Sequence, residues 1–236
     1  MIPWLTGNAP FPPVESALRS PNGLLAAGGD LSAPRLLEAY RHGIFPWFNP
    51  GEPALWWSPD PRMVLIPDEF KISRSLAKVL RNAAYEVRCD TGFEQVMRNC
   101  AAPSGEQGGT WINEDMIAAY CALHEMGYAH SVETWIDGHL AGGLYGVSIG
   151  RMFYGESMFS HAANASKIAL AHLAWQLERW QADHPIKGMI DCQMNTAHLA
   201  SLGAREIPRS EFIARLQELI NCEPVARWQF DTDLFM

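Results

Sequence analysis

The segment Phe153-Tyr154-Gly155-Glu156-Ser157-Met158-Phe159-Ser160 predicts a strand that runs into a loop. It places one carboxylate, Glu156, among aromatic and apolar side chains, where an ionised group is costly unless a cation or a hydrogen-bond donor meets it. A second carboxylate, Asp191, ends another apolar run, Gly188-Met189-Ile190. Two carboxylates at strand ends indicate a polar site within an apolar pocket. The alternative is that both are structural and only cap loops.

The composition allows a sizeable core and one large domain, or a small domain followed by a larger one. The chain has 236 residues, of which 48% are hydrophobic and 19% charged, so extensive disorder is not expected. Five cysteines without Cys-x-x-Cys spacing and without a preceding signal peptide favour free thiols in a reducing cytosol. No apolar run is long enough to span a membrane. A formal charge of −8 argues against a general nucleic-acid coat protein but allows a local basic patch.

Residues 1–62 are expected to form a small, loop-rich domain. A Pro-rich extended arm precedes a turn-rich link at 23–30, and Ser32 caps a short helix that ends near Gly43. Aromatic segments broken by Pro and Gly follow, and nine tryptophans exceed what the core needs. We therefore expect an exposed aromatic surface that acts as a lid or a stacking platform. A strand at 63–67 marks the boundary, and residues 63–236 form the second domain.

Four cations follow one face of a helix predicted at about 73–82. Their spacing of three and four residues places them side by side, and together we call them the cationic stripe: Lys71, Arg74, Lys78 and Arg81. A solvated surface is the commoner explanation of such a pattern. In an acidic protein the stripe is nevertheless the best candidate for a contact with a phosphate backbone.

The order of elements after residue 84 predicts the fold class. A strand and two helices precede three strands in a meander, with a hairpin turn at Asp137-Gly138; a long helix at about 165–181, a strand, a short helix, an edge strand and a final helix follow. This α+β order resembles the acyltransferase fold of the acetyl-CoA N-acetyltransferases, whose mostly antiparallel central sheet splays apart. The strands that end at Glu156 and Asp191 are the pair expected to open. Glycines at 142, 143 and 146 allow a bulge or a close approach of ligand.

Several chemistries find no support in the sequence. The histidines are scattered and lack His-Glu-x-x-His spacing, so a metal site is not expected, and no Gly-x-Ser-x-Gly elbow indicates a serine hydrolase. Cys192 alternates with Asp191 and Gln193, so it is expected to face the other side of the strand and pack into the core. The segment 160–167, before the long helix, lacks the glycines of an acetyl-CoA pyrophosphate loop.

A set of longer motifs is similar to the leucyl/phenylalanyl-tRNA–protein transferase family. These motifs lie within residues 11–220: Tyr40-Arg41-His42-Gly43-Ile44-Phe45-Pro46-Trp47, 56–62, Gly109-Thr110-Trp111-Ile112, 153–160, Asn164-Ala165-Ser166-Lys167, Ile190-Asp191-Cys192-Gln193 and 200–204. The resemblance implies a bacterial cytosolic enzyme without a cofactor. It would transfer Leu or Phe, and less readily Met, from aminoacyl-tRNA to the α-amino group of proteins that begin with Arg or Lys. The product would enter N-end rule degradation.

The resemblance also implies roles for individual residues. Trp47 and Trp111 would sandwich the terminal adenine, and Tyr40 and Tyr120 would hydrogen-bond the nucleoside. We call the expected pocket for the donor side chain the donor pocket, with six candidate residues: Leu144, Phe153, Met158, Leu170, Ala174 and Ile190.

Three polar residues would carry the reaction. Asp191 would polarise Gln193, whose carbonyl accepts a proton from the attacking amine, and Glu156 would orient the site and meet the cationic end of the acceptor. The cationic stripe would hold the tRNA body. Two alternatives remain open at this point: an acetyl-CoA-type N-acetyltransferase of the same fold, and a non-catalytic tRNA-binding or peptide-binding module.

Overall fold

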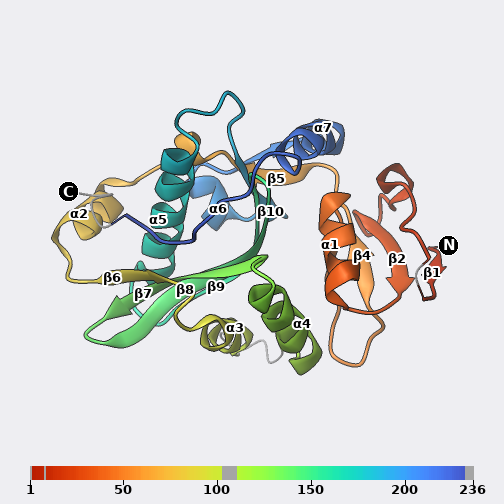
Figure 1. Cartoon of the computed structure of the whole chain (residues 1–236), viewed down its shortest axis with the longest axis horizontal. Helices are drawn as coiled ribbons and strands as arrows, with labels where there is room; N and C mark the ends of the chain where they lie inside the picture. The colour runs from red at the N-terminus through yellow and green to blue at the C-terminus, as the bar shows by residue number, and fades with distance from the viewer. Residues whose placement is uncertain (1, 8, 103–110, 232–236) are drawn as a thin grey trace.

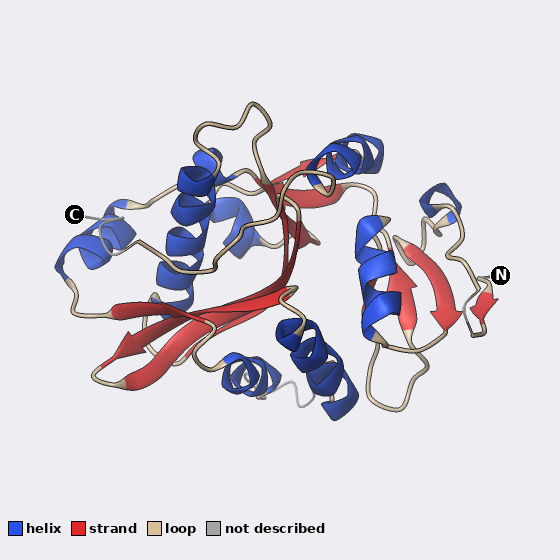
Figure 2. Ribbon diagram, in the orientation of Figure 1, coloured by secondary structure: helices blue, strands red, loops and turns tan. Residues whose placement is uncertain are grey.

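The computed structural model describes residues 2–7, 9–102 and 111–231, and two β-sheets organise them (Figures 1 and 2). The first sheet has the strand order β1-β2-β4-β3 and comprises β1 (Trp4–Leu5), β2 (Leu24–Gly28), β3 (Phe45–Pro46) and β4 (Leu55–Trp57). The second has the order β11-β5-β10-β9-β8-β7-β6. Its strands are β5 (Arg62–Leu65), β6 (Glu86–Cys89), β7 (Ala129–Ile136), β8 (His139–Ile149), β9 (Met152–Ser160), β10 (Met189–Gln193) and β11 (Arg205–Ile207).

The first sheet corrects the expectation of a turn-rich link at 23–30. Residues 24–28 form the inner strand β2, which pairs with β1 and β4 and buries Leu25, Ala26 and Ala27. The indole nitrogen of Trp56 donates to the carbonyl oxygen of Gly28 at 2.8 Å, and the Trp56 side chain is fully buried. Trp57 is buried as well, so these two tryptophans form core and not an exposed platform.

The second sheet is mostly antiparallel, as predicted. Every neighbouring pair of its strands is antiparallel except β9 and β10, which run parallel. The predicted hairpin joins β7 and β8, and both turn residues, Asp137 and Gly138, have positive φ. The sheet begins at Arg62, one residue before the expected boundary.

Helices cover both faces of the second sheet (Figure 1). Side chains of α2 and α5 pack on one face, and those of α3 and α4 pack on the other. The α-helices are α1 (Ala33–Arg41), α2 (Arg74–Asn82), α3 (Phe93–Ala101), α4 (Glu114–Glu125), α5 (Ala165–Trp180), α6 (Ala197–Ser201) and α7 (Arg209–Leu219). Side-chain caps at Ser73, Asn113 and Thr196 begin α2, α4 and α6, because each side chain accepts a hydrogen bond from a free backbone N–H of the first turn.

The sheet splays between β9 and β10. These strands pair from Met152 with Met189 up to Tyr154 with Asp191, and the described backbone shows no pairing between them beyond that point. The prediction of an opening pair is therefore correct, but β9 continues to Ser160 and does not end at Glu156. Opposite β8, the register shifts at Glu156, which is the extra residue of a β-bulge. Such a bulge redirects a side chain within a continuing strand.

Candidate active site

A cavity of about 460 Å³ opens where β9 and β10 part. We call it the site cavity, and it has both apolar and polar walls: Phe45, Pro46, Trp47, Trp111, Leu144, Phe153, Gly155, Glu156, Ser157, Met158, Leu170, Ile190, Cys192, Gln193, Met194, Thr196, His198 and Leu199. It contains both candidate adenine tryptophans, two of the three candidate catalytic residues and five of the six donor-pocket residues. The sixth, Ala174, lies on α5 and is fully buried in the core.

Glu156 is the buried acid of the site cavity. Its carboxylate accepts hydrogen bonds from the Tyr120 hydroxyl at 3.0 Å and from the Gln193 side-chain nitrogen at 3.1 Å. Burial raises the pKa of Glu156 to about 7, although the hydroxyls of Tyr40 and Tyr120 act in the opposite direction. Near neutral pH this group therefore exchanges readily between its charged and neutral forms.

Gln193 presents an acceptor to the site cavity. The amide nitrogen of Gln193 faces Glu156, as the ionised carboxylate requires because it can only accept, and the amide oxygen is directed away from it. No described residue donates a hydrogen bond to that oxygen. Gln193 lies where β10 shifts register against β5, and its φ of +60° is uncommon for a residue other than glycine. Its backbone N–H donates to Asp191 Oδ1 at 2.9 Å, which stabilises this conformation.

Asp191 does not line the site cavity, because it is bound to Arg62 within the core. Arg62 Nε and Nη2 donate to the two carboxylate oxygens at 2.8 and 2.7 Å, and both side chains are fully buried. The guanidinium lies between the rings of Phe45 and Phe212 and also donates to the Gly43 carbonyl at 3.1 Å. The contact of Asp191 with Gln193 is therefore to the Gln193 backbone and not to its side chain, and the sequence reasoning missed Arg62.

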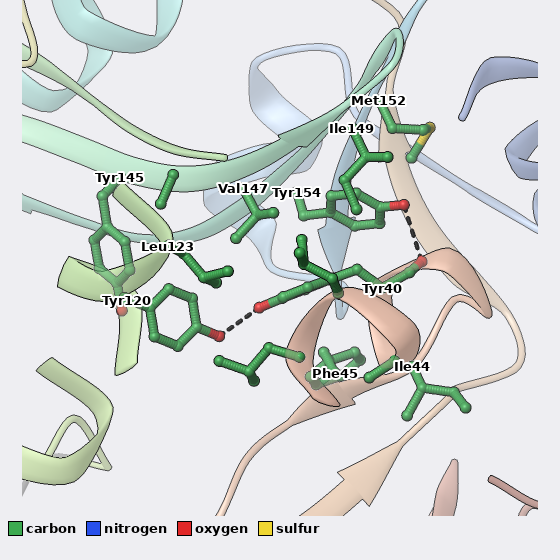
Figure 3. Close-up of a cluster of buried hydrophobic side chains, with 14 of the residues drawn as sticks. Tyr40, Ile44, Phe45, Tyr120, Leu123, Tyr145, Val147, Ile149, Met152 and Tyr154 are labelled. Atoms are coloured by element: carbon green, nitrogen blue, oxygen red, sulfur yellow. Dashed lines mark hydrogen bonds between the residues drawn. The ribbon is translucent and has the colours of Figure 1, made fainter. Parts of the chain in front are cut away.

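Tyr40 and Tyr120 lie behind Glu156 and do not line the site cavity. Both rings are buried, and their hydroxyls are hydrogen-bonded to each other (Figure 3). Since Tyr120 donates to Glu156, Tyr40 donates to Tyr120; Tyr154 in turn donates to the Tyr40 carbonyl at 2.9 Å. Burial raises the pKa of both phenols well above the usual range, so they remain donors.

Comparisons with known proteins identify the family. Models of the leucyl/phenylalanyl-tRNA protein transferase and of its N-terminal domain match residues 64–217 and 29–60. The chain belongs to this family. A leucyl/phenylalanyl-tRNA–protein transferase of Nitrosospira multiformis is 65% identical over 232 residues, covering 98% of each chain. One of Nitrosomonas europaea is 66% identical over 233 residues, covering 98% of this chain and 96% of the relative.

Solved structures are more distant. A GCN5-related N-acetyltransferase from Kribbella flavida aligns with a TM-score of 0.34 and 9% identity, covering 72% of this chain and 59% of the other. A functionally unknown conserved protein from Staphylococcus epidermidis aligns with a TM-score of 0.43 and 8% identity, covering 78% and 68%. As a member of the leucyl/phenylalanyl-tRNA protein transferase family, the chain is a transferase.

The two tryptophans of this transferase differ in exposure. Trp47 is 40% exposed, and its carbonyl accepts from the Trp57 indole at 2.6 Å, which fixes the backbone below the exposed ring. Trp111 is half-buried. Of its motif, Gly109 and Thr110 lie outside the described residues.

Several lining residues of the site cavity escaped the sequence reasoning. Met194, Thr196, His198 and Leu199 come from the loop and short helix after β10. They could have been found from the sequence because they follow the candidate residue Gln193 directly in the chain. Cys192 was expected to pack into the core; it does contact the core cluster that includes α5, but it is only half-buried and also lines the site cavity. Burial raises the pKa of its thiol above the usual range.

The cationic stripe lies on the protein surface. All four of its side chains are exposed, and none forms an ion pair with a described carboxylate. Lys71 precedes α2, and the other three lie on it. Within the described ranges, no helix has the length and apolarity to cross a membrane, and no group of three or more His, Cys, Asp or Glu side chains could hold a metal ion.

Proposed function

We propose that this transferase moves Leu or Phe, and less readily Met, from aminoacyl-tRNA to the α-amino group of proteins that begin with Arg or Lys. The observation that carries the proposal is the site cavity, which joins an apolar pocket to an acid–amide pair at the point where two strands part. An ester-linked amino acid needs an apolar slot, and an incoming amine needs an acceptor for its proton.

The donor side chain enters the apolar part of the site cavity. Phe153 and Ile190 lie on adjacent paired strands, Leu144 pairs with Met158, and Leu170 of α5 closes the pocket. A slot of this shape admits side chains unbranched at Cβ and disfavours Ile and Val. The terminal adenine would stack on Trp47 and Trp111, which is worth ~1–3 kcal/mol per stacked base. Tyr40 and Tyr120 would reach the nucleoside only through Glu156, because their hydroxyls are committed to one another and to that carboxylate.

The reaction requires little beyond positioning, since the donor is already an activated ester. The acceptor nitrogen attacks the ester carbonyl carbon, a C–N bond forms, and the bond from that carbon to the ribose oxygen breaks. The side-chain oxygen of Gln193 accepts a proton of the attacking amine, which finally reaches the departing ribose oxygen. Glu156 holds the Gln193 amide in this orientation, and Asp191 holds the Gln193 backbone. In this scheme Asp191 is a positioning residue.

The remaining surfaces suit the two macromolecular substrates. The cationic stripe would contact tRNA phosphates without reading sequence, and the negative charge of Glu156 near the site cavity would favour an acceptor with a cationic first residue. We further propose that residues 1–62 are a separate domain that supplies Trp47. Because tRNA and newly made proteins meet in the bacterial cytosol, we place the enzyme there and its products in the N-end rule pathway.

A single-turnover transfer assay tests the proposal. Labelled Phe should move from Phe-tRNA to a peptide that begins with Arg, and not to the same peptide with an acetylated amino terminus. Glu156→Ala and Gln193→Ala should each abolish most transfer while the protein still binds Phe-tRNA. Binding without any transfer by the unaltered chain would instead identify a non-catalytic module, and transfer from acetyl-CoA would identify an N-acetyltransferase.

A further inference from the structure

The C-terminal segment, residues 222–231, follows the part of the chain that the family model matches and crosses α5 (Figure 1). Gln176 of α5 holds it at two points: Asp231 N donates to the Gln176 side-chain oxygen at 2.7 Å, and the Gln176 side-chain nitrogen donates to Asp231 Oδ2 at 3.0 Å. Gln176 is fully buried, so both of its polar atoms depend on this segment. Arg179 adds an ion pair to Asp231 at 3.2 Å. The segment is therefore docked in one position.

This docking places Trp228 against the sheet. Its ring stacks on His130 of β7, with centroids 3.9 Å apart and an interplanar angle of 10°. It also packs against the rings of Phe153 of β9 and Trp180 of α5, whose centroids lie 5.7 and 5.3 Å from that of Trp228. Between β7 and β9 lies Gly146, where an added Cβ would come within 2.6 Å of the Phe153 ring. The Phe153 ring is thus confined by the backbone of Gly146 on one side and by the Trp228 ring on another.

Phe153 is also a wall of the site cavity, whereas Trp228 lies outside that cavity. We propose that Trp228 is a specificity-determining residue that acts through Phe153. It blocks the space into which the Phe153 ring would otherwise retreat, and so it limits the depth of the donor pocket to side chains no larger than Phe. This inference rests on the proposed function, because it assumes that the apolar part of the site cavity receives the donor side chain.

The test compares donors of two sizes. We measure kcat/KM for transfer from Phe-tRNA and from Trp-tRNA to the same Arg-starting peptide, in the unaltered protein and in Trp228→Ala. The ratio of the two values should fall about tenfold in Trp228→Ala, since a gain or loss of apolar space in a pocket commonly changes discrimination by that order. Trp228→Phe should keep most of the ratio. Phe230→Ala is the matched control, because Phe230 belongs to the same segment but contacts Trp180.

A second measurement separates pocket depth from loss of folding. Calorimetry with non-hydrolysable phenylalanyl- and tryptophanyl-amino-adenosine gives the corresponding ratio of dissociation constants. Asp231→Ala removes the side-chain contacts of Asp231 with Gln176 and Arg179, which weakens the docking of the segment, and should lower this ratio in the same direction. An unchanged ratio in both Trp228→Ala and Asp231→Ala, with transfer of Phe intact, would overturn the inference alone. Failure of the unaltered chain to bind either analogue would overturn the proposed function and the inference with it.

Discussion

Replacing Arg62 by Met should both destabilise the protein and stop transfer. The substitution removes the guanidinium that gives Asp191 two hydrogen bonds of 2.8 and 2.7 Å, in a position with no solvent exposure. Only the Gln193 N–H remains among the described donors to that carboxylate. A buried carboxylate left without its cation costs about 3–5 kcal/mol of unfolding free energy. For a chain of this length that loss corresponds to a fall in Tm of about 6–20 °C.

A second substitution identifies the cause. In Arg62→Met combined with Asp191→Asn, no charge is buried, and the Asn side-chain oxygen can still accept from Gln193 N–H. The double variant should therefore recover most of the lost stability and, because Gln193 keeps its position, a large part of the activity. Asp191→Leu in the same background should recover stability but not activity, since nothing then accepts from Gln193 N–H.

Urea unfolding measures the free energies, and the single-turnover assay measures the activity of each variant. The reasoning is refuted if Arg62→Met loses less than about 1 kcal/mol, which is the scale of an ordinary exposed ion pair. It is also refuted if the Asn and Leu double variants are equally active, because the hydrogen bond to Gln193 would then be irrelevant to transfer.

Three further outcomes are expected. Since the pKa of Glu156 is raised from 4.5 to about 7, the folded state binds more protons than the unfolded state between these values, so stability should fall as pH rises through that window, by about 3 kcal/mol. In urea unfolding, Glu156→Gln should flatten the dependence of the unfolding free energy on pH, and an unchanged dependence would mean that another group causes it. Trp111→Ala should weaken calorimetric binding of an aminoacyl-adenosine analogue by ~1–3 kcal/mol, and full affinity would remove the stacking role. Reversing the charges of the cationic stripe should make the slope of log binding constant for tRNA against log salt concentration less steep by about 3. An unchanged slope would mean that the stripe is only a solvated face.

The sequence predicted those parts of the fold that depend on local signals. The hairpin at Asp137-Gly138 follows from two adjacent residues, and the structure has it where it was expected. The helix expected after Ser32 is also present as α1, but the Ser32 side chain makes no capping hydrogen bond to it. The order of strands and helices after residue 84 then limited the topology to a mostly antiparallel sheet that splays. The strand β2 was missed because small residues flanked by glycines show no period, and only its neighbours in the sheet make it a strand.

The sequence pointed to many of the residues that line the site cavity but gave no indication of its geometry. The sequence showed Glu156 and Gln193 as polar groups in apolar runs, whereas the bulge that directs Glu156 depends on the register of β8, which no local signal gives. The partner of Asp191 is 129 positions away in the chain. A lone arginine at the start of the apolar run Met63-Val64-Leu65 was the available signal, because a cation in a buried strand requires a buried anion. Trp228 was missed because its contact with Phe153 depends on the docking of the last segment.

The ion pair between Arg62 and Asp191 also bears on the order in which the protein is made. A ribosome completes Arg62 long before it reaches Asp191, so during synthesis the cation has no counter-ion and cannot be buried without a large penalty. We therefore expect β5 to stay hydrated until β10 emerges and brings the carboxylate to it. The nascent chain would then complete its second sheet and its site cavity in the same late step, and a truncated product that lacks β10 would have neither.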